Sequence, residues 1–132
     1  MTVERLNPDG VAPPVGAYSH LAVVPAGMRL LVMSGQVGVR PDGSVAETLE
    51  AQLEQALANI GVILASQGAS FADVVKLTYF FVERPADRGP IRKILAAAFP
   101  NPPASTLLYI SGLASPDLKV EIEVMAAVPA QP

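Results

Sequence analysis

The chain has 132 residues, the length of a single domain covering 1–132, and 51% of them are hydrophobic against 16% charged. This composition excludes a disordered tail, and 9 basic against 12 acidic residues argue against binding to a nucleic-acid backbone. With no cysteine and one histidine, the chain cannot form a disulfide, a zinc–thiolate site or a multi-histidine metal site.

No apolar run approaches the roughly 20 residues that span a bilayer, and the N-terminal segment 1–6 has no apolar core of signal-peptide length. We therefore expect a cytoplasmic protein with no membrane partner. A chain shorter than about 150 residues builds a modest core, so association with further copies would add useful burial.

The first third of the sequence predicts an extended arm followed by a β-hairpin. Three prolines within residues 1–16 favour extended backbone in the arm. Residues 17–24 and 28–35 have the composition of strands, and Pro25-Ala26-Gly27 between them is typical of a turn. We expect these two strands to pair with each other.

A long helix is predicted over residues 45–67. Ser44 precedes Glu47 by three positions, the spacing of a capping box, and Gly68 is suited to the end of the helix. Apolar residues recur at steps of three and four along one face: Leu49, Leu53, Ala56, Leu57, Ile60 and Leu64.

The second half of the chain alternates strands with one more helix. Residues 73–82 are rich in β-branched and aromatic side chains and predict a central strand. Asp87 and Pro90 favour the start of a second helix, and residues 105–113 and 118–128 predict the last two strands. The order β-β-α-β-α-β-β predicts an α/β (α+β) sandwich, with one mixed sheet and two helices on one face.

One face of this sheet is left without helices. The strand over 73–82 is apolar on both faces, so a second copy of the chain is the simplest cover for the free one. In the last strand, Leu118, Val120, Ile122 and Val124 should face the helices. Glu121 and Glu123 then project from the free face, where carboxylates must be solvated, paired or part of a site between subunits.

Several short motifs occur in the same order as in a known family. They are 16–20 (Gly-Ala-Tyr-Ser-His), 32–36 (Val-Met-Ser-Gly-Gln), 58–60 (Ala-Asn-Ile), 73–76 (Asp-Val-Val-Lys), 103–104 (Pro-Ala) and 120–123 (Val-Glu-Ile-Glu). With these motifs the chain resembles the RidA/YjgF family of imine and enamine deaminases, also called L-PSP endoribonucleases, from about residue 12 to 128.

The resemblance implies a chorismate-mutase-like fold assembled as a homotrimer, with small-molecule sites in the clefts between subunits and no metal or organic cofactor. The reaction it implies is hydrolysis of 2-imino acids to 2-keto acids with release of ammonia. In the family an arginine in a Pro-Ala-Arg-Ser motif binds the substrate carboxylate, and a glutamate in the last strand positions or activates water.

Carried over residue by residue, the resemblance implies four site residues. Tyr18 would line the cleft, Ser34 and Gly35 would form its Ser-Gly-Gln turn, and Glu121 would be the catalytic carboxylate. The residues alone do not separate Glu121 from Glu123. The alternative role for Glu121 is an interface carboxylate paired with Lys119, Lys76 or an arginine.

The carboxylate-binding arginine is missing. This chain reads Pro103-Ala104-Ser105-Thr106, which puts Ser105 at the arginine position, and Arg92 replaces an asparagine of the second helix. Both are candidate substrate-binding residues, Arg92 as a compensating cation. A neutral hydroxyl binds a carboxylate less strongly than a bidentate arginine does.

Three functions follow from this reading. The first is a hydrolase or deaminase of a small imine or related reactive metabolite, with weak or no activity on 2-imino acids. The second is a non-catalytic trimer that binds small metabolites. The third, an endoribonuclease or translation inhibitor, is disfavoured by the acidic balance of the chain.

Overall fold

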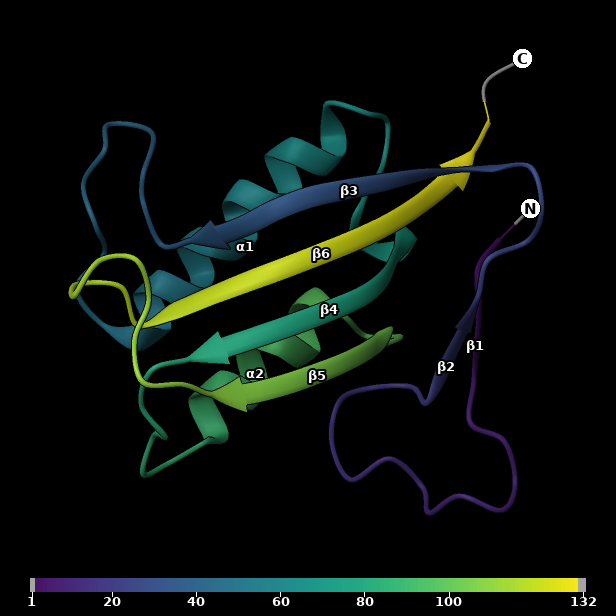
Figure 1. Cartoon of the computed structure of the whole chain (residues 1–132), viewed down its shortest axis with the longest axis horizontal. Coiled ribbons are helices and arrows are strands. Elements are labelled where there is room, and N and C mark those ends of the chain that lie inside the picture. Colours follow the sequence, from purple (N-terminus) through teal and green to yellow (C-terminus); the bar gives the residue numbers. More distant parts are fainter. Residues whose placement is uncertain (1, 131–132) are drawn as a thin grey trace.

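Two helices pack on one face of a four-stranded mixed sheet, and a short two-stranded ribbon stands beside it (Figure 1). The computed structural model describes residues 2–130. In chain order the elements are β1 (Glu4–Leu6), β2 (Leu21–Val23), β3 (Met28–Val37), α1 (Leu49–Ala65), the 3-10 turn η1 (Phe71–Asp73), β4 (Val74–Phe81), α2 (Gly89–Ala98), β5 (Ala104–Tyr109) and β6 (Val120–Pro129). Within residues 2–130, no helix combines the length and apolar character needed to cross a membrane.

The sheet has the strand order β3-β6-β4-β5, with β6 antiparallel to both neighbours and β5 parallel to β4. The parallel pair is connected through α2, as parallel strands require a crossover. The predicted fold class, a sandwich with both helices on one face of a mixed sheet, is confirmed. The strand predicted over 105–113 ends at Tyr109, because its partner β4 ends at Phe81, the residue that pairs with Tyr109.

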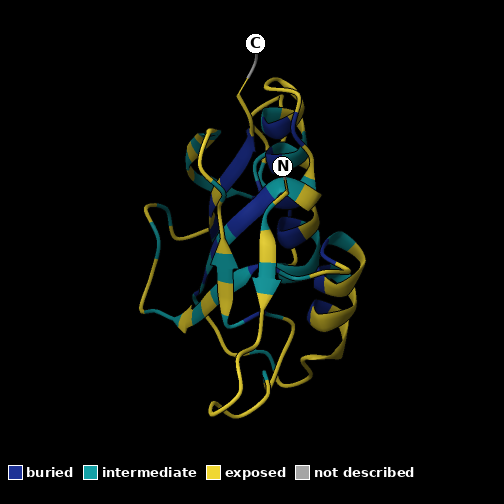
Figure 2. Ribbon diagram, turned by 90° about the vertical axis from the view of Figure 1, so that its right-hand side faces the viewer, coloured by how far each residue is buried: buried dark blue, intermediate teal, exposed yellow. Residues whose placement is uncertain are grey.

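The core lies between the sheet and the two helices (Figure 2). In β6, Val120, Ile122 and Val124 are at most 1% exposed, so these three residues face the helices as predicted. Leu118, the fourth residue of the predicted set, lies before the strand, which begins at Val120. The expected apolar face of α1 supplies most of the opposite wall, with the buried residues Leu53, Ala56, Leu57, Ile60 and Leu64.

Helix α1 begins later than predicted. Thr48 is its N-cap, with the hydroxyl accepting a hydrogen bond from the Ala51 amide at 3.1 Å. The expected capping box at Ser44 is wrong, because the Ser44 hydroxyl donates instead to Asp42 within the preceding turn at 2.6 Å. This hydrogen bond, and a second one from the Ser44 amide at 2.9 Å, hold the pKa of the Asp42 carboxyl below its usual value.

The hairpin predicted for residues 17–24 and 28–35 is also wrong. β2 pairs with β1, and β3 pairs with β6. Ser19 explains the difference, because its amide and hydroxyl donate to the carbonyls of Pro103 (3.0 Å) and Pro102 (2.6 Å). These bonds hold the residues before β2 next to the start of β5, at the opposite edge of the sheet from β3.

The face of the sheet away from the helices carries apolar side chains that no other part of the described chain covers. Val32 is 70% exposed and Leu30 is 52% exposed on β3, Leu108 is 44% exposed on β5, and Met125 is 36% exposed on β6. We call these four residues the outer patch. A row of apolar residues across several strands is unusual for a surface in contact with water alone.

Gln52 connects α1 to two loops. It is 1% exposed, and its side-chain amide donates to the carbonyls of Ala46 and Asp117, both at 2.9 Å. Its carbonyl oxygen accepts from the Lys119 amide at 2.7 Å. One buried side chain therefore satisfies three backbone groups from the segments that precede α1 and β6.

Gln52→Leu should lower the free energy of unfolding by about 2–4 kcal/mol, because it leaves three backbone groups without partners in a buried place. Glu54→Leu, at an exposed position of the same helix, should change it by less than about 0.5 kcal/mol. Urea unfolding at a fixed protein concentration measures both values. Equal midpoints for the two variants would contradict this account of the Gln52 network.

Candidate functional site

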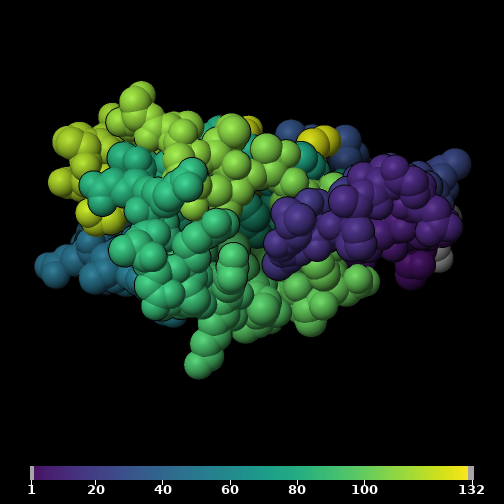
Figure 3. All heavy atoms as spheres, turned by 90° about the horizontal axis from the view of Figure 1, so that it is seen from below, coloured from purple at the N-terminus to yellow at the C-terminus, as the bar shows by residue number. Residues whose placement is uncertain are grey.

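A cavity of about 220 Å³ lies between the sheet, α2 and the N-terminal arm. In Figure 3 the purple arm lies against the green atoms of α2 and β5, and a hollow opens between them. Four segments provide the lining residues: Val15, Gly16, Ala17 and Tyr18 of the arm; Tyr79, Phe81 and Pro85 from β4 and its loop; Arg88, Ile91, Arg92 and Leu95 from the start of α2; and Ser105, Leu107 and Tyr109 of β5.

The strands supply an aromatic wall. Tyr79 and Phe81 alternate with outward residues along β4, and their rings lie 6.3 Å apart. Tyr109 stands beside Phe81 at a ring distance of 6.2 Å, and the guanidinium of Arg84 lies over the Tyr109 ring, 4.7 Å from its centre.

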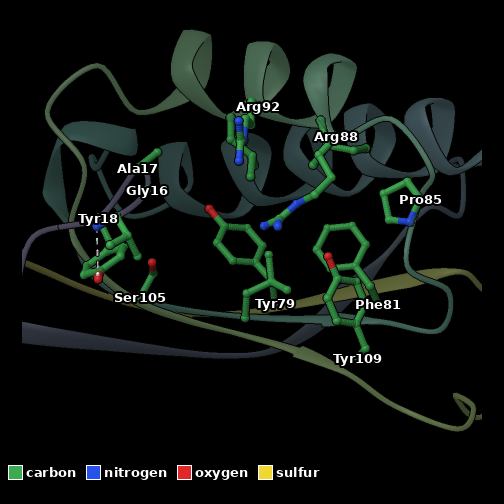
Figure 4. A pocket seen from close by; sticks show the side chains of 14 residues that line it. Gly16, Ala17, Tyr18, Tyr79, Phe81, Pro85, Arg88, Arg92, Ser105 and Tyr109 are labelled. Atoms are coloured by element: carbon green, nitrogen blue, oxygen red, sulfur yellow. Dashed lines mark hydrogen bonds between the residues drawn. The ribbon is translucent and has the colours of Figure 1, made fainter.

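The hydroxyl of the buried Tyr79 faces the cavity. The residue is 4% exposed, yet the side chain has no hydrogen-bond partner among residues 2–130, and Figure 4 shows the oxygen directed from the sheet toward α2. Burial raises the pKa of this hydroxyl above its ordinary value, so it stays protonated at any physiological pH. It is a hydrogen-bond donor that faces the cavity, where water or a ligand can accept from it.

Two arginines enter the cavity from α2. Arg88 is the N-cap of the helix and Arg92 follows one turn later, which places both on the same side. Figure 4 shows Arg88 reaching from the helix toward the rings of Tyr79 and Phe81, and Arg92 projecting from the same helix on the cavity side. The predicted start of this helix is confirmed, and the Asp87 carboxylate accepts a hydrogen bond from the Gly89 amide at 2.9 Å.

Ser105 lies in the same cavity, on the helix-facing side of β5. Its neighbour Thr106 points to the other side, where it accepts a hydrogen bond from Lys76 at 2.9 Å. Lys76 is therefore bound to a hydroxyl on the outer face.

Tyr18 closes the cavity from the arm. Its ring meets His20 edge-on at 5.6 Å, and its hydroxyl accepts a 3.4 Å hydrogen bond from the Val15 amide, the dashed line in Figure 4. Three of the predicted site residues, Tyr18, Arg92 and Ser105, are thus brought together from distant parts of the sequence.

The remaining predicted residues lie on the other face of the sheet. Glu121 alternates with the buried Val120 and Ile122, so its side chain points away from the helices. It lies against Gly35, where an added Cβ would be 2.7 Å from Cδ and 2.8 Å from Oε2 of Glu121. Ser34 stands beside Gly35, in the stretch where the register of β3 against β6 shifts.

The structure therefore divides the predicted site residues into two sets. We call Tyr18, Arg92 and Ser105 with their cavity the pocket half, and Ser34, Gly35 and Glu121 the carboxylate half. Within one chain the two halves lie on opposite sides of the sheet, so they cannot act on the same small molecule. Among residues 2–130, no group of three metal-ligating side chains is found in either half.

Arg88 and Tyr79 belong to the pocket half and were not predicted. Arg88 had no signal in the sequence beyond its position two residues before Pro90, a residue typical of a first helical turn. The alternation of the central strand puts Tyr79 on one of its faces, but this pattern does not separate a packed tyrosine from a pocket tyrosine.

Comparison with known proteins agrees with this fold. The family model described as Endoribonuclease L-PSP matches residues 10–128. The chain is 34% identical over 119 residues to the 2-iminobutanoate/2-iminopropanoate deaminase of Rattus norvegicus. This match covers 85% of this chain and 80% of that protein. It is 35% identical over 102 residues to Reactive Intermediate Deaminase A, chloroplastic, of Arabidopsis thaliana, covering 76% of this chain but only 54% of that protein.

A solved structure gives the same result. A protein of unknown function of the conserved Rid family, YyfB from Yersinia pestis, matches with a TM-score of 0.88 at 33% identity, over 97% of this chain and 100% of that chain. This chain belongs to the RidA/YjgF family, whose model carries the L-PSP endoribonuclease name. Relatives that resemble it are named 2-iminobutanoate/2-iminopropanoate deaminase or Reactive Intermediate Deaminase A.

Gly35→Ala should displace the Glu121 carboxylate without unfolding the protein, because the new methyl group meets the mobile end of a side chain. A crystal structure of the variant should show Glu121 in another rotamer. Gly112→Ala is the matched control, since no atom lies within 4 Å of its added Cβ. An unmoved Glu121 in Gly35→Ala would contradict the close packing of the two residues.

Proposed function

We propose that this protein is an imine or enamine hydrolase whose active site forms between subunits of a homotrimer. The pocket half of one subunit would meet the carboxylate half of the next. The observation that carries the proposal is the division of the predicted site residues between two faces of one chain. Neither half contains all of the predicted site residues, and each chain carries one pocket half and one carboxylate half.

The geometry of such a contact supports a ring. The two halves are different patches, so the contact joins unlike surfaces head to tail, and contacts of this kind form a ring when the rotation between neighbours closes. The outer patch supports burial of the carboxylate face against neighbours, and the family resemblance supports three subunits.

In the proposed reaction the imine carbon lies between the halves. Glu121 accepts a proton from a water molecule as the water oxygen bonds to that carbon, and the electron pair of the C=N bond moves to nitrogen, which takes up a proton. In the resulting carbinolamine the amine nitrogen takes up the proton held by Glu121, and the C–N bond breaks with its electron pair going to nitrogen. Ammonia leaves, the hydroxyl proton passes to water, and a carbonyl compound remains. The balance is one water consumed and one ammonia released.

A metabolite-binding trimer without catalysis is the second candidate. One observation favours it: the neutral Ser105 hydroxyl lines the cavity where the family resemblance implies a guanidinium. The assay described below separates the two, because a binding protein does not accelerate imine hydrolysis.

Size-exclusion chromatography with light scattering should give three times 13.7 kDa. Val32→Asp should shift the mass toward that of a monomer, because it places a charge in the outer patch. Val62→Asp is the control, since Val62 on α1 is 72% exposed against 70% for Val32. A wild-type monomer, or an intact trimer in Val32→Asp, would contradict the proposed assembly.

Glu121→Gln should reduce imine hydrolysis by about a hundredfold or more, because a neutral amide cannot accept the proton of water. Glu123→Gln, which changes the same charge two positions along β6, should retain activity. The imine is generated in situ with an amino-acid oxidase and trapped by semicarbazide, and the enzyme diverts it before trapping. Equal rates for the two variants would contradict the role assigned to Glu121.

A further inference from the structure

We propose that the pocket half binds a carboxylate carrying a bulky apolar substituent, with Arg88 and Arg92 as its cationic partners and the Tyr79 hydroxyl as a neutral donor. The inference rests on the proposed function, because it names the substrate class for the same site. In this proposal the anion-binding charge lies on the first turns of α2 and not on β5, where Ser105 stands at the position of the arginine that the family resemblance implies.

The charge of the cavity selects an anion. Its fourteen lining residues include Arg88 and Arg92 and no aspartate or glutamate. The nearest acidic side chain in sequence, Asp87, is turned to the Gly89 amide. Two cations one helical turn apart, above aromatic rings, suit the two oxygens of a carboxylate better than any neutral group.

The Tyr79 hydroxyl adds a neutral donor to the two cations. The ring is buried, but the hydroxyl opens on the cavity and makes no hydrogen bond with residues 2–130, so it is free to donate to a ligand there. This hydroxyl is aimed at the space beneath Arg88 and Arg92 and remains protonated. It can donate to an oxygen held by those arginines, and burial keeps that donor available.

The rest of the cavity selects the substituent. Beyond the polar groups the lining is aromatic or aliphatic, with Phe81, Ile91, Leu95, Leu107 and Tyr109. Its volume of about 220 Å³ exceeds the roughly 150 Å³ in which an engineered apolar cavity holds benzene. A two- or three-carbon acid leaves this apolar surface wet, whereas a phenyl or branched alkyl group displaces the water from it.

Together these features predict that the protein prefers 2-imino acids derived from large apolar amino acids over 2-iminopropanoate. The stable products of the same class, aromatic 2-keto acids, can be used to measure binding without turnover. They keep the carboxylate and the apolar group, and they differ from the imine only in having oxygen in place of the imine nitrogen.

Calorimetric titration of the wild-type protein with three probes tests the ligand class. Phenylpyruvate should bind at least about tenfold more tightly than pyruvate, which lacks the ring. It should also bind at least about tenfold more tightly than benzyl methyl ketone, which lacks the carboxylate. Equal affinity for phenylpyruvate and either comparison compound would overturn the proposal.

Variants test the residues. Arg88→Met and Arg92→Met should each weaken phenylpyruvate binding about tenfold and leave benzyl methyl ketone unaffected, while Arg88→Lys should retain part of the affinity. Lys93→Met is the matched control, since it removes the same charge from an exposed position of α2 outside the cavity lining. Tyr79→Phe should cost about three- to tenfold. Loss in Lys93→Met equal to that in the arginine variants would overturn the proposal.

Two outcomes separate this inference from the proposed function. If phenylpyruvate binds through Arg88 and Arg92 but no imine is hydrolysed, the inference stands and the catalytic proposal fails. If imines are hydrolysed through Glu121 while the Arg88, Arg92 and Tyr79 variants bind all probes like wild type, the inference fails and the catalytic proposal stands.

Discussion

The one-sided cover of the sheet is the constraint on which the rest of the structure depends. Both helices pack on the same face, so every strand must send alternate residues into the core and out of it. In β6 this alternation places Ile122 in the core and Glu121 on the opposite face. The same rule on β5 turns Ser105 toward α2 and Leu108 toward the outer patch. The division of the site into two halves follows from this alternation.

Because the site is divided, association of chains in the proposed trimer would both bury apolar surface and complete the site. Burying the outer patch would remove apolar surface from water, which favours association of any copies that fit. In the proposed trimer it would also bring a carboxylate from one chain to a cationic cavity on another. A different part of the chain sets the geometry of each half. Gly35 leaves the space that the Glu121 side chain occupies, and the start of α2 positions Arg88.

The candidate site was predictable from the sequence only in part. The resemblance pointed to Tyr18, Ser105 and Arg92, and the structure places all three at one cavity. It gave no indication of Arg88 or Tyr79. An arginine in a helical first turn is usually solvated, and a tyrosine in a core strand usually packs, so neither differs from its ordinary role until the cavity between them is known.

By itself the sequence determined the order of the main elements and the inward face of β6, because periodic apolar residues can be buried only one way. It did not determine the pairing of residues 17–24, which depends on hydrogen bonds from Ser19 to Pro102 and Pro103, more than eighty positions away. It also did not determine that Glu121 and Ser105 lie on opposite faces of one chain. Strand order and the faces of neighbouring strands arise from contacts between distant segments, and only the tertiary structure contains them.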